Sequence, residues 1–101
     1  MTNKGILNLP FVLTVGTVVT DYWARPAETG DWAQDNWTGR SYANALVGAC
    51  NDGQLGMVLS HVASAITEKG QYGGIEVGFF NRLGEIASFA GAGVSELRKA
   101  A

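Results

Sequence analysis

The apolar residues in the first third of the chain form one run dominated by branched side chains. From Phe11 to Trp23 the chain reads FVLTVGTVVTDYW. Valine and threonine lose rotamer freedom in a helix and pack well on a pleated surface, so this run predicts an extended segment. Gly16 has no side chain to pack, and it predicts a bulge or a bend within the segment.

The same run has a helical alternative. Asn8 and Pro10 can open a helix, since both residue types are common at helix starts. Four large side chains then follow at helical spacing, namely Phe11, Val15, Val18 and Tyr22. If this alternative holds, the fold is all-α.

Two segments farther along have the period of amphipathic helices. Thr38 is a candidate N-cap for a helix that runs to about Cys50, where residues 51–53 provide a stop signal. Asp52 in turn can cap a helix that Gly70 ends. The apolar stripe of this second helix consists of Leu55, Val58, Leu59, Val62 and Ile66.

A third amphipathic segment covers residues 75–90. Its broad apolar face comprises Ile75, Phe79, Leu83, Ile86 and either Phe80 or Phe89. Gly91 and Gly93 then interrupt the pattern, and Ser95 with Glu96 can begin a short last helix of sequence SELRKAA. The basic end of that helix suits the negative pole of its dipole.

Together these elements predict one mostly helical α+β domain over residues 1–101, an extended segment followed by three to four short helices in a small bundle. A chain of 101 residues suits a single hydrophobic core. Short connections favour antiparallel neighbours, so the helices at 54–69 and 75–90 should form a hairpin with the first helix packed across it. The extended segment must curl into a hairpin, pair with residues 20–30 or pair with another chain, because buried backbone groups need partners.

Composition excludes some partners. Hydrophobic residues make up 47% of the chain and charged residues 16%, as in a folded globule. The seven basic residues are scattered and the net charge is −2, so we expect no nucleic-acid partner. The single cysteine, Cys50, fits a reducing cytoplasm.

The apolar stretch Ile6–Val19 raises the question of a membrane span or a signal peptide. It contains Asn8 and Pro10, and it is shorter than the ~20 apolar residues that a spanning helix needs. A pattern of small residues for cleavage does not follow it. We therefore expect a soluble, cytoplasmic protein with no membrane partner.

Few residues offer catalytic chemistry. Cys50 and His61 are the single thiol and the single imidazole, and a nucleophilic cysteine needs a base within reach of its proton. Packing of their helices would bring them near one another, whereas lone residues of these types are commonly structural. Asp31 and Asp35 suit solvated charges at a helix start. The sequence has no metal-ligand spacing, and the glycine-rich residues 91–95 lack the lysine of a phosphate-binding loop, so we expect no cofactor and no metal.

The aromatic segment, residues 20–42, is the strongest candidate for a binding surface. Large rigid rings give contact area at low entropic cost and are enriched at binding hot spots. Arginines among them can contact carboxylates or stack on rings. The candidate binding residues are Tyr22, Trp23, Arg25, Trp32, Trp37, Arg40 and Tyr42. The alternative is that these rings fold back over the helices as part of the core.

The expected function follows by elimination. It is a small non-enzymatic module that binds another protein or itself, as a regulator or inhibitor, an accessory subunit or a structural component of an assembly. The aromatic segment or the N-terminal strand would be its interface. The alternative is a small ligand-binding domain or enzyme with a pocket between the aromatic segment and helices 54–69 and 75–90, using His61. Exposed tryptophans would favour the first function, and tryptophans lining an enclosed cavity with His61 would favour the second.

Overall fold

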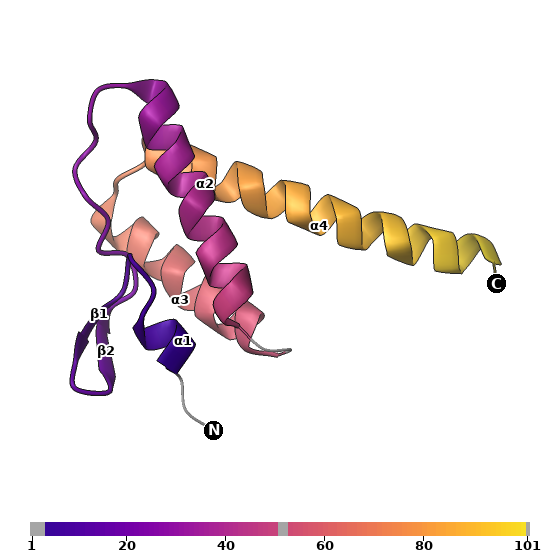
Figure 1. Cartoon of the computed structure of the whole chain (residues 1–101), viewed down its shortest axis with the longest axis horizontal. Coiled ribbons are helices and arrows are strands. Elements are labelled where there is room, and N and C mark those ends of the chain that lie inside the picture. The colour runs from indigo at the N-terminus through magenta and orange to yellow at the C-terminus, as the bar shows by residue number, and fades with distance from the viewer. Residues whose placement is uncertain (1–3, 51–52, 101) are drawn as a thin grey trace.

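The computed structural model describes residues 4–50 and 53–100, and it describes side chains for residues 5–50 and 53–88. In chain order the elements are α1 (Lys4–Leu7), β1 (Leu13–Val15), β2 (Val18–Asp21), α2 (Trp32–Ala49), α3 (Gln54–Lys69) and α4 (Gly74–Ala100). Figure 1 shows the three long helices meeting in one body, with the strands beside them and α4 extending beyond it. The predicted class, mostly helical α+β, is confirmed.

The branched apolar run folds back on itself as a β-hairpin. β1 and β2 pair antiparallel, with Val15 opposite Val18 and Leu13 opposite Asp21. Gly16 adopts a φ of 61°, a left-handed conformation that glycine takes without strain, and so provides the predicted bend. The helical alternative for this run is wrong. The backbone groups of the predicted extended segment therefore find hydrogen-bond partners in the chain's own hairpin, which is the first of the three predicted arrangements.

The core forms around Phe11, which is fully buried just before β1. Its ring centroid lies 5.1 Å from that of Trp23, 5.1 Å from that of Tyr42 and 6.0 Å from that of Phe79. The planes are tilted or edge-on, the arrangements that aromatic quadrupoles favour. This cluster joins the segment before the hairpin, the connection after it, α2 and α4.

Helix α2 begins at Trp32, seven residues earlier than the predicted N-cap Thr38 allows. Asp31 is the N-cap instead, and its carboxylate accepts hydrogen bonds from the backbone N–H groups of Ala33 (3.0 Å) and Gln34 (3.2 Å). The Thr38 hydroxyl donates to the carbonyl oxygen of Gln34 inside the helix. The predicted helix that ends near Cys50 therefore includes the residues from Trp32 onward as well.

Helix α3 agrees closely with its prediction. Its residues Val58, Val62 and Ile66 are buried, and Gly70 ends it in the left-handed conformation with its N–H directed at the carbonyl oxygens of Ile66 and Thr67. Gly53 is the residue at the N-cap position. The predicted N-cap, Asp52, lies outside the described residues.

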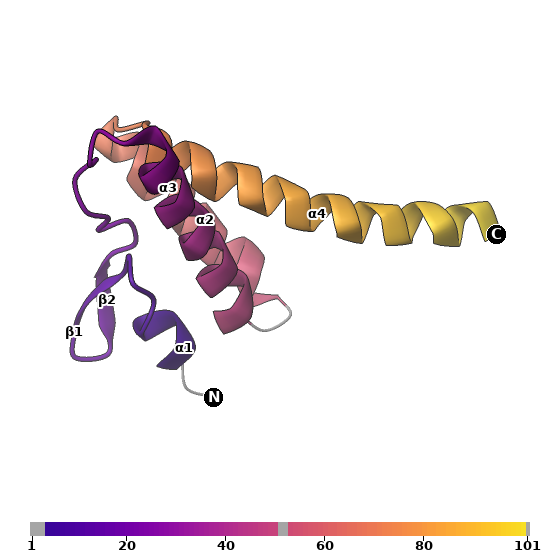
Figure 2. The same ribbon diagram turned by 45° about the horizontal axis from the view of Figure 1, so that its top comes forward.

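Helix α4 is longer than predicted, because it continues through Gly91 and Gly93 to Ala100. The predicted break at these glycines and the separate helix from Ser95 are wrong. A glycine weakens a helix interior by about 1 kcal/mol relative to alanine, but it ends a helix only where a left-handed C-cap forms. Figures 1 and 2 both show the second half of α4 projecting away from the body.

Helix α4 packs most closely on α2, not on α3. A Cβ atom at Gly39 of α2 would fall on the carbonyl oxygen of Ile75, and one at Gly78 of α4 would fall on that of Asn36. The two glycines therefore let the helix backbones touch where they cross. The predicted hairpin of the 54–69 and 75–90 helices is wrong in its choice of partner, because Gly39 and Gly78 let α4 approach the backbone of α2 instead.

Candidate functional site

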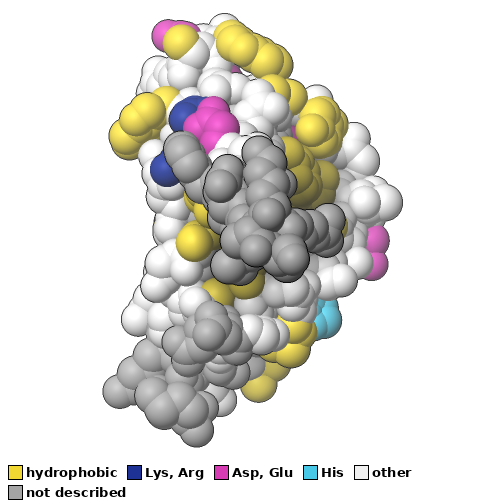
Figure 3. Space-filling model, turned by 90° about the vertical axis from the view of Figure 1, so that its right-hand side faces the viewer, with side chains coloured by type: hydrophobic (Ala, Val, Ile, Leu, Met, Phe, Trp, Pro, Cys, Tyr) yellow, Lys and Arg dark blue, Asp and Glu magenta, His cyan; other side chains and the backbone are white. Residues whose placement is uncertain are grey.

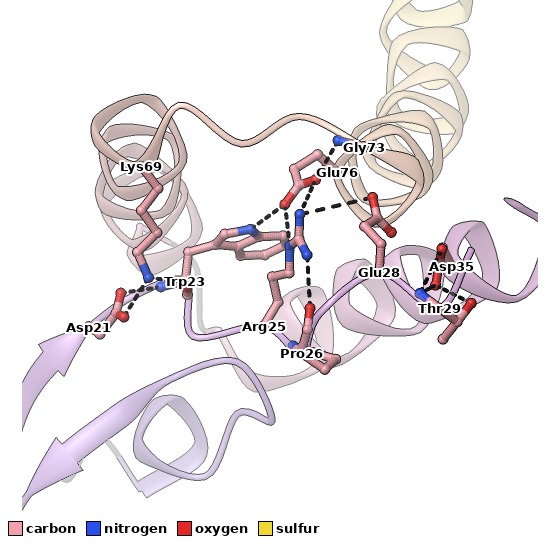
Figure 4. Close-up of polar contacts among 10 residues, drawn as sticks. All are labelled: Asp21, Trp23, Arg25, Pro26, Glu28, Thr29, Asp35, Lys69, Gly73 and Glu76. Carbon is pink, nitrogen blue, oxygen red and sulfur yellow. Dashed lines mark hydrogen bonds and ion pairs between the residues drawn. The ribbon is translucent and has the colours of Figure 1, made fainter. Parts of the chain in front are cut away.

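The connection between β2 and α2 crosses the ends of α3 and α4 without regular secondary structure (Figure 4). Trp23 anchors its first part, since its side chain is 1% exposed and its indole N–H donates to Glu76 Oε2 at 2.8 Å. Lys69, at the end of α3, donates to Asp21 Oδ2 and to the carbonyl oxygen of Trp23, both at 2.6 Å. The chain is thus tied to two helices as it leaves the hairpin.

Glu76 is the centre of this arrangement, and its side chain is fully buried. Oε2 accepts from Arg25 Nε at 2.8 Å as well as from Trp23, and Oε1 accepts from the Gly73 N–H at 2.7 Å and from Arg25 Nη2 at 3.2 Å. Burial alone would raise the pKa of Glu76, but the hydrogen bonds from Arg25, Gly73 and Trp23 outweigh it and hold that pKa below its ordinary value. A buried carboxylate with every lone pair engaged has no capacity left to act on a substrate.

Asp35 closes a second polar cluster at the start of α2. It accepts from the Thr29 N–H at 3.0 Å and from the Thr29 hydroxyl at 2.8 Å, and it is buried. Burial raises its pKa, but the hydrogen bonds from Thr29 outweigh that effect and lower it. Burial comes first, and then the neighbouring Asp35, among the causes that raise the pKa of Glu28. Asp35 is therefore not the solvated charge that its sequence position suggests, whereas Asp31 is exposed.

The remaining candidate binding residues divide into exposed and buried ones. Trp32 is 61% exposed and Trp37 is 68% exposed, while Tyr42 belongs to the buried aromatic cluster. Arg40 donates from both terminal nitrogens to Glu85 of α4, each at 2.9 Å. Hydrogen bonds from Arg40 and then Arg82 lower the pKa of Glu85 to about 2.

Cys50 and His61 lie in different surroundings. Cys50 is half-buried at the C-cap of α2, where burial raises its thiol pKa. His61 is exposed on α3 and stacks on Tyr22, with ring centroids 4.7 Å apart and planes 14° apart. A cavity of about 220 Å³ adjoins this stack, and the described residues that line it come from 20–22 and from α3. None of the three tryptophans, Cys50 or the helix at 75–90 contributes to that lining.

Sequence reasoning missed Glu76 as an organising residue. Its position carried a signal, because it follows Gly73 by three residues, and an acidic side chain at that helix position reaches back to the N-cap N–H. The partners Trp23 and Arg25, more than 50 residues earlier, carried no such signal.

Among residues 5–50 and 53–88, whose side chains the structure describes, His, Cys, Asp and Glu form no group of three or more that could hold a metal ion. In that same part of the chain, no helix combines the length and hydropathy needed to cross a bilayer. Models of known protein families, curated protein sequences and solved structures were all compared with the chain, and none of them matches.

Proposed function

We propose that this chain is a non-enzymatic module that binds another protein through the exposed start of α2, where Trp32 and Trp37 lie. The observation that carries the proposal is the exposure of these two rings, 61% and 68%, on a helix start that the chain holds in place. Exposure of a large apolar ring to water is unfavourable, and burial of the ring against a partner removes that cost. Tryptophan is also among the residues most enriched at binding hot spots.

The rigidity of this helix start supports the proposal. The Asp31 carboxylate caps α2, and Asp35 in the next turn is bonded to Thr29 of the connection. Gly78 and Gly39 hold α2 directly against α4. A surface that is already ordered before binding loses less conformational entropy when it binds.

The two rings lie on different sides of the helix. At 3.6 residues per turn, five residues correspond to about 500° of rotation, so the side chains leave α2 about 140° apart. One partner contacts both only if it wraps the helix start. Arg40, one turn after Trp37 and paired with Glu85, supplies a polar rim on that side.

The test compares proteins captured by immobilised wild-type chain with those captured by Trp32→Ala and Trp37→Ala, singly and together. Extract from the native host is the source, and far-UV circular dichroism verifies that each variant is folded. Because hot-spot truncations cost more than 1 kcal/mol, we expect each substitution to lower recovery of the partner by about tenfold. Met57→Ala is the matched control, since Met57 is an exposed apolar residue on α3.

Equal recovery of the same protein by the wild type and by the double variant would contradict the proposal. A loss that also occurs with Met57→Ala would show general stickiness instead of a specific surface.

The hairpin offers an alternative surface for the same function. Leu13, Val15 and Val18 are each more than half exposed, and a short hairpin presents unpaired edges to an added strand. Val15→Thr with Val18→Thr tests this surface in the same capture experiment, with β propensity retained. Because the chain has one free thiol, the cytoplasm stays the proposed location.

A further inference from the structure

A cavity of about 240 Å³ adjoins Trp32 of the proposed binding surface. Its lining comes from the connection, the first turn of α2 and the start of α4, and consists of Glu28, Gly30, Trp32, Asp35, Gly73 and Gly74. A Cβ atom at Gly73 would fall on the Glu28 carboxylate. One at Gly74 would lie 3.0 Å from Asp35 Cβ and 3.3 Å from Trp32 Cε3. These two glycines therefore let three side chains from other elements lie directly on the start of α4.

Carboxylates outnumber cations around this cavity. The Arg25 guanidinium interacts electrostatically with Glu76, Glu28 and Asp35. It pairs closely with Glu76, at 2.8 Å, whereas its contact with Glu28 Oε1 is longer, at 3.9 Å. Figure 4 shows Glu28 between Arg25 and Asp35. In the part of the chain that the structure describes, this group of three carboxylates and one guanidinium therefore has two negative charges in excess.

The starts of α2 and α4 lie near this group, but their dipoles do not cancel the excess. Each helix start amounts to roughly half a positive charge, so the two together offset about one negative charge. The exposed carboxylate of Asp31 at the N-cap of α2 adds one back. Burial, and then the neighbouring Asp35, raises the pKa of Glu28. Contact with a cation would favour the charged form of Glu28.

We propose that the cavity beside Trp32 receives a basic side chain, lysine or arginine, of the protein that this module binds. This inference rests on the proposed function and adds the chemistry of the partner to it. Tryptophan attracts a cation more strongly than any other aromatic side chain, and the Trp32 ring is 61% exposed. The Glu28 side chain is 32% exposed and can accept a charge-assisted hydrogen bond. An aromatic ring and a carboxylate in one cavity favour a cation over a neutral or an acidic group.

The surroundings of Trp37 have the opposite charge. Arg40 follows Trp37 by three residues on α2, and Arg40 and Arg82 both pair with Glu85. Figure 3 shows basic side chains beside an acidic one on the face of the molecule that looks toward the end of α4. A basic side chain of the partner is therefore favoured at Trp32 and disfavoured at Trp37. This difference in charge would orient the partner on the start of α2.

The experiment follows the indole N–H signal of Trp32 by nuclear magnetic resonance while short peptides are added to the chain. The probes are acetylated and amidated tripeptides, Ala-Lys-Ala, Ala-Arg-Ala and Ala-norleucine-Ala, and Trp32→Phe identifies the signal. We expect at least one basic peptide to shift this signal to saturation below about 20 mM. Norleucine resembles lysine in shape but has no charge, so its peptide should bind at least ~5-fold more weakly.

Glu28→Gln keeps the shape of the side chain and removes its negative charge from the cavity. Arg25 retains Glu76 as its partner, so this variant should fold, and far-UV circular dichroism verifies it. We expect the basic peptides to bind it at least ~5-fold more weakly than the wild type. Glu68→Gln is the matched control, because it makes the same change of charge beside a different cavity. It should alter the affinity by less than ~2-fold.

The inference would be overturned if neither basic peptide gave a saturable shift, or if the norleucine peptide bound equally well. Both results come from the wild-type chain and do not depend on the folding of a variant. Equal weakening by Glu28→Gln and Glu68→Gln would overturn it too, since attraction to the net charge of the chain would then explain the binding. The peptides replace the partner protein, so a failure here is distinct from a failure of the capture experiment, which contradicts the proposed function.

Discussion

The buried carboxylate of Glu76 is the centre of the polar cluster that holds the β2–α2 connection against the start of α4. It links α4 to Trp23 and Arg25, and both its oxygens are fully engaged. Among the described side chains, no buried polar atom lacks a hydrogen-bond partner. Removing one partner from such a network leaves the other buried and unpaired. The resulting loss of stability is much larger than the net stabilisation that the intact pair provides.

We therefore expect Glu76→Gln to lower the free energy of unfolding by about 3 kcal/mol at pH 7, because the Arg25 guanidinium stays buried without its counter-ion. The difference should shrink in acid. Glu76 has a lower pKa folded than unfolded, so its stabilisation is complete above the unfolded pKa and is lost as pH falls through the folded one. Urea denaturation at pH 7, 5, 4 and 3 measures both effects. Exposed Glu68→Gln is the control, and a Glu76→Gln difference below 1 kcal/mol at pH 7 would contradict the prediction.

At the scale of elements, the crossing of α2 and α4 depends on glycines that admit no side chain. Gly39→Ala and Gly78→Ala should each destabilise the fold by about 3 kcal/mol, because the helices must separate to admit a methyl group against backbone. Gly48→Ala, on α2 where the added Cβ meets nothing, should be neutral or stabilise by up to about 1 kcal/mol. Thermal and urea unfolding followed by circular dichroism measures these changes. Equal effects at positions 39 and 48 would show that the helices do not touch.

The sequence predicts a helix or strand well where interactions between residues close in sequence determine it. Val58, Val62 and Ile66 have helical spacing and Gly70 provides a C-cap, so α3 could be read directly. The start of α2 was misplaced because two candidate caps, Asp31 and Thr38, precede helical residues, and only the bonds from Ala33 and Gln34 decide between them.

Other parts of the fold depend on contacts distant in sequence. Gly39 and Gly78 select α2 as the partner of α4, and no pattern within either helix indicates that pairing. For the candidate site, the sequence indicated the aromatic segment, and its role in binding stays a prediction. Solvent exposure distinguishes the tryptophans of the aromatic segment, because Trp23 belongs to the Phe11 cluster while Trp32 and Trp37 lie outside it.

The whole molecule is longer than a compact chain of its size. Its Cα radius of gyration is 14.9 Å, against about 13 Å for a compact domain of 100 residues, because α4 leaves the body. Small-angle X-ray scattering on a dilute solution of the chain should therefore give a radius of gyration of at least about 15 Å. A value near 13 Å would mean that α4 bends back at Gly91, as its sequence pattern alone suggests.

The anchored connection also limits how the chain length can vary. Within seven residues, Trp23, Arg25 and Thr29 anchor the chain to Lys69, Glu76 and Asp35. One inserted residue would therefore displace every later anchor by about 3.5 Å. That displacement exceeds what a hydrogen bond tolerates. The connection is irregular in shape but fixed in length. Insertions should be tolerated instead at the Gly16 turn, because no contact outside the hairpin depends on the number of residues there.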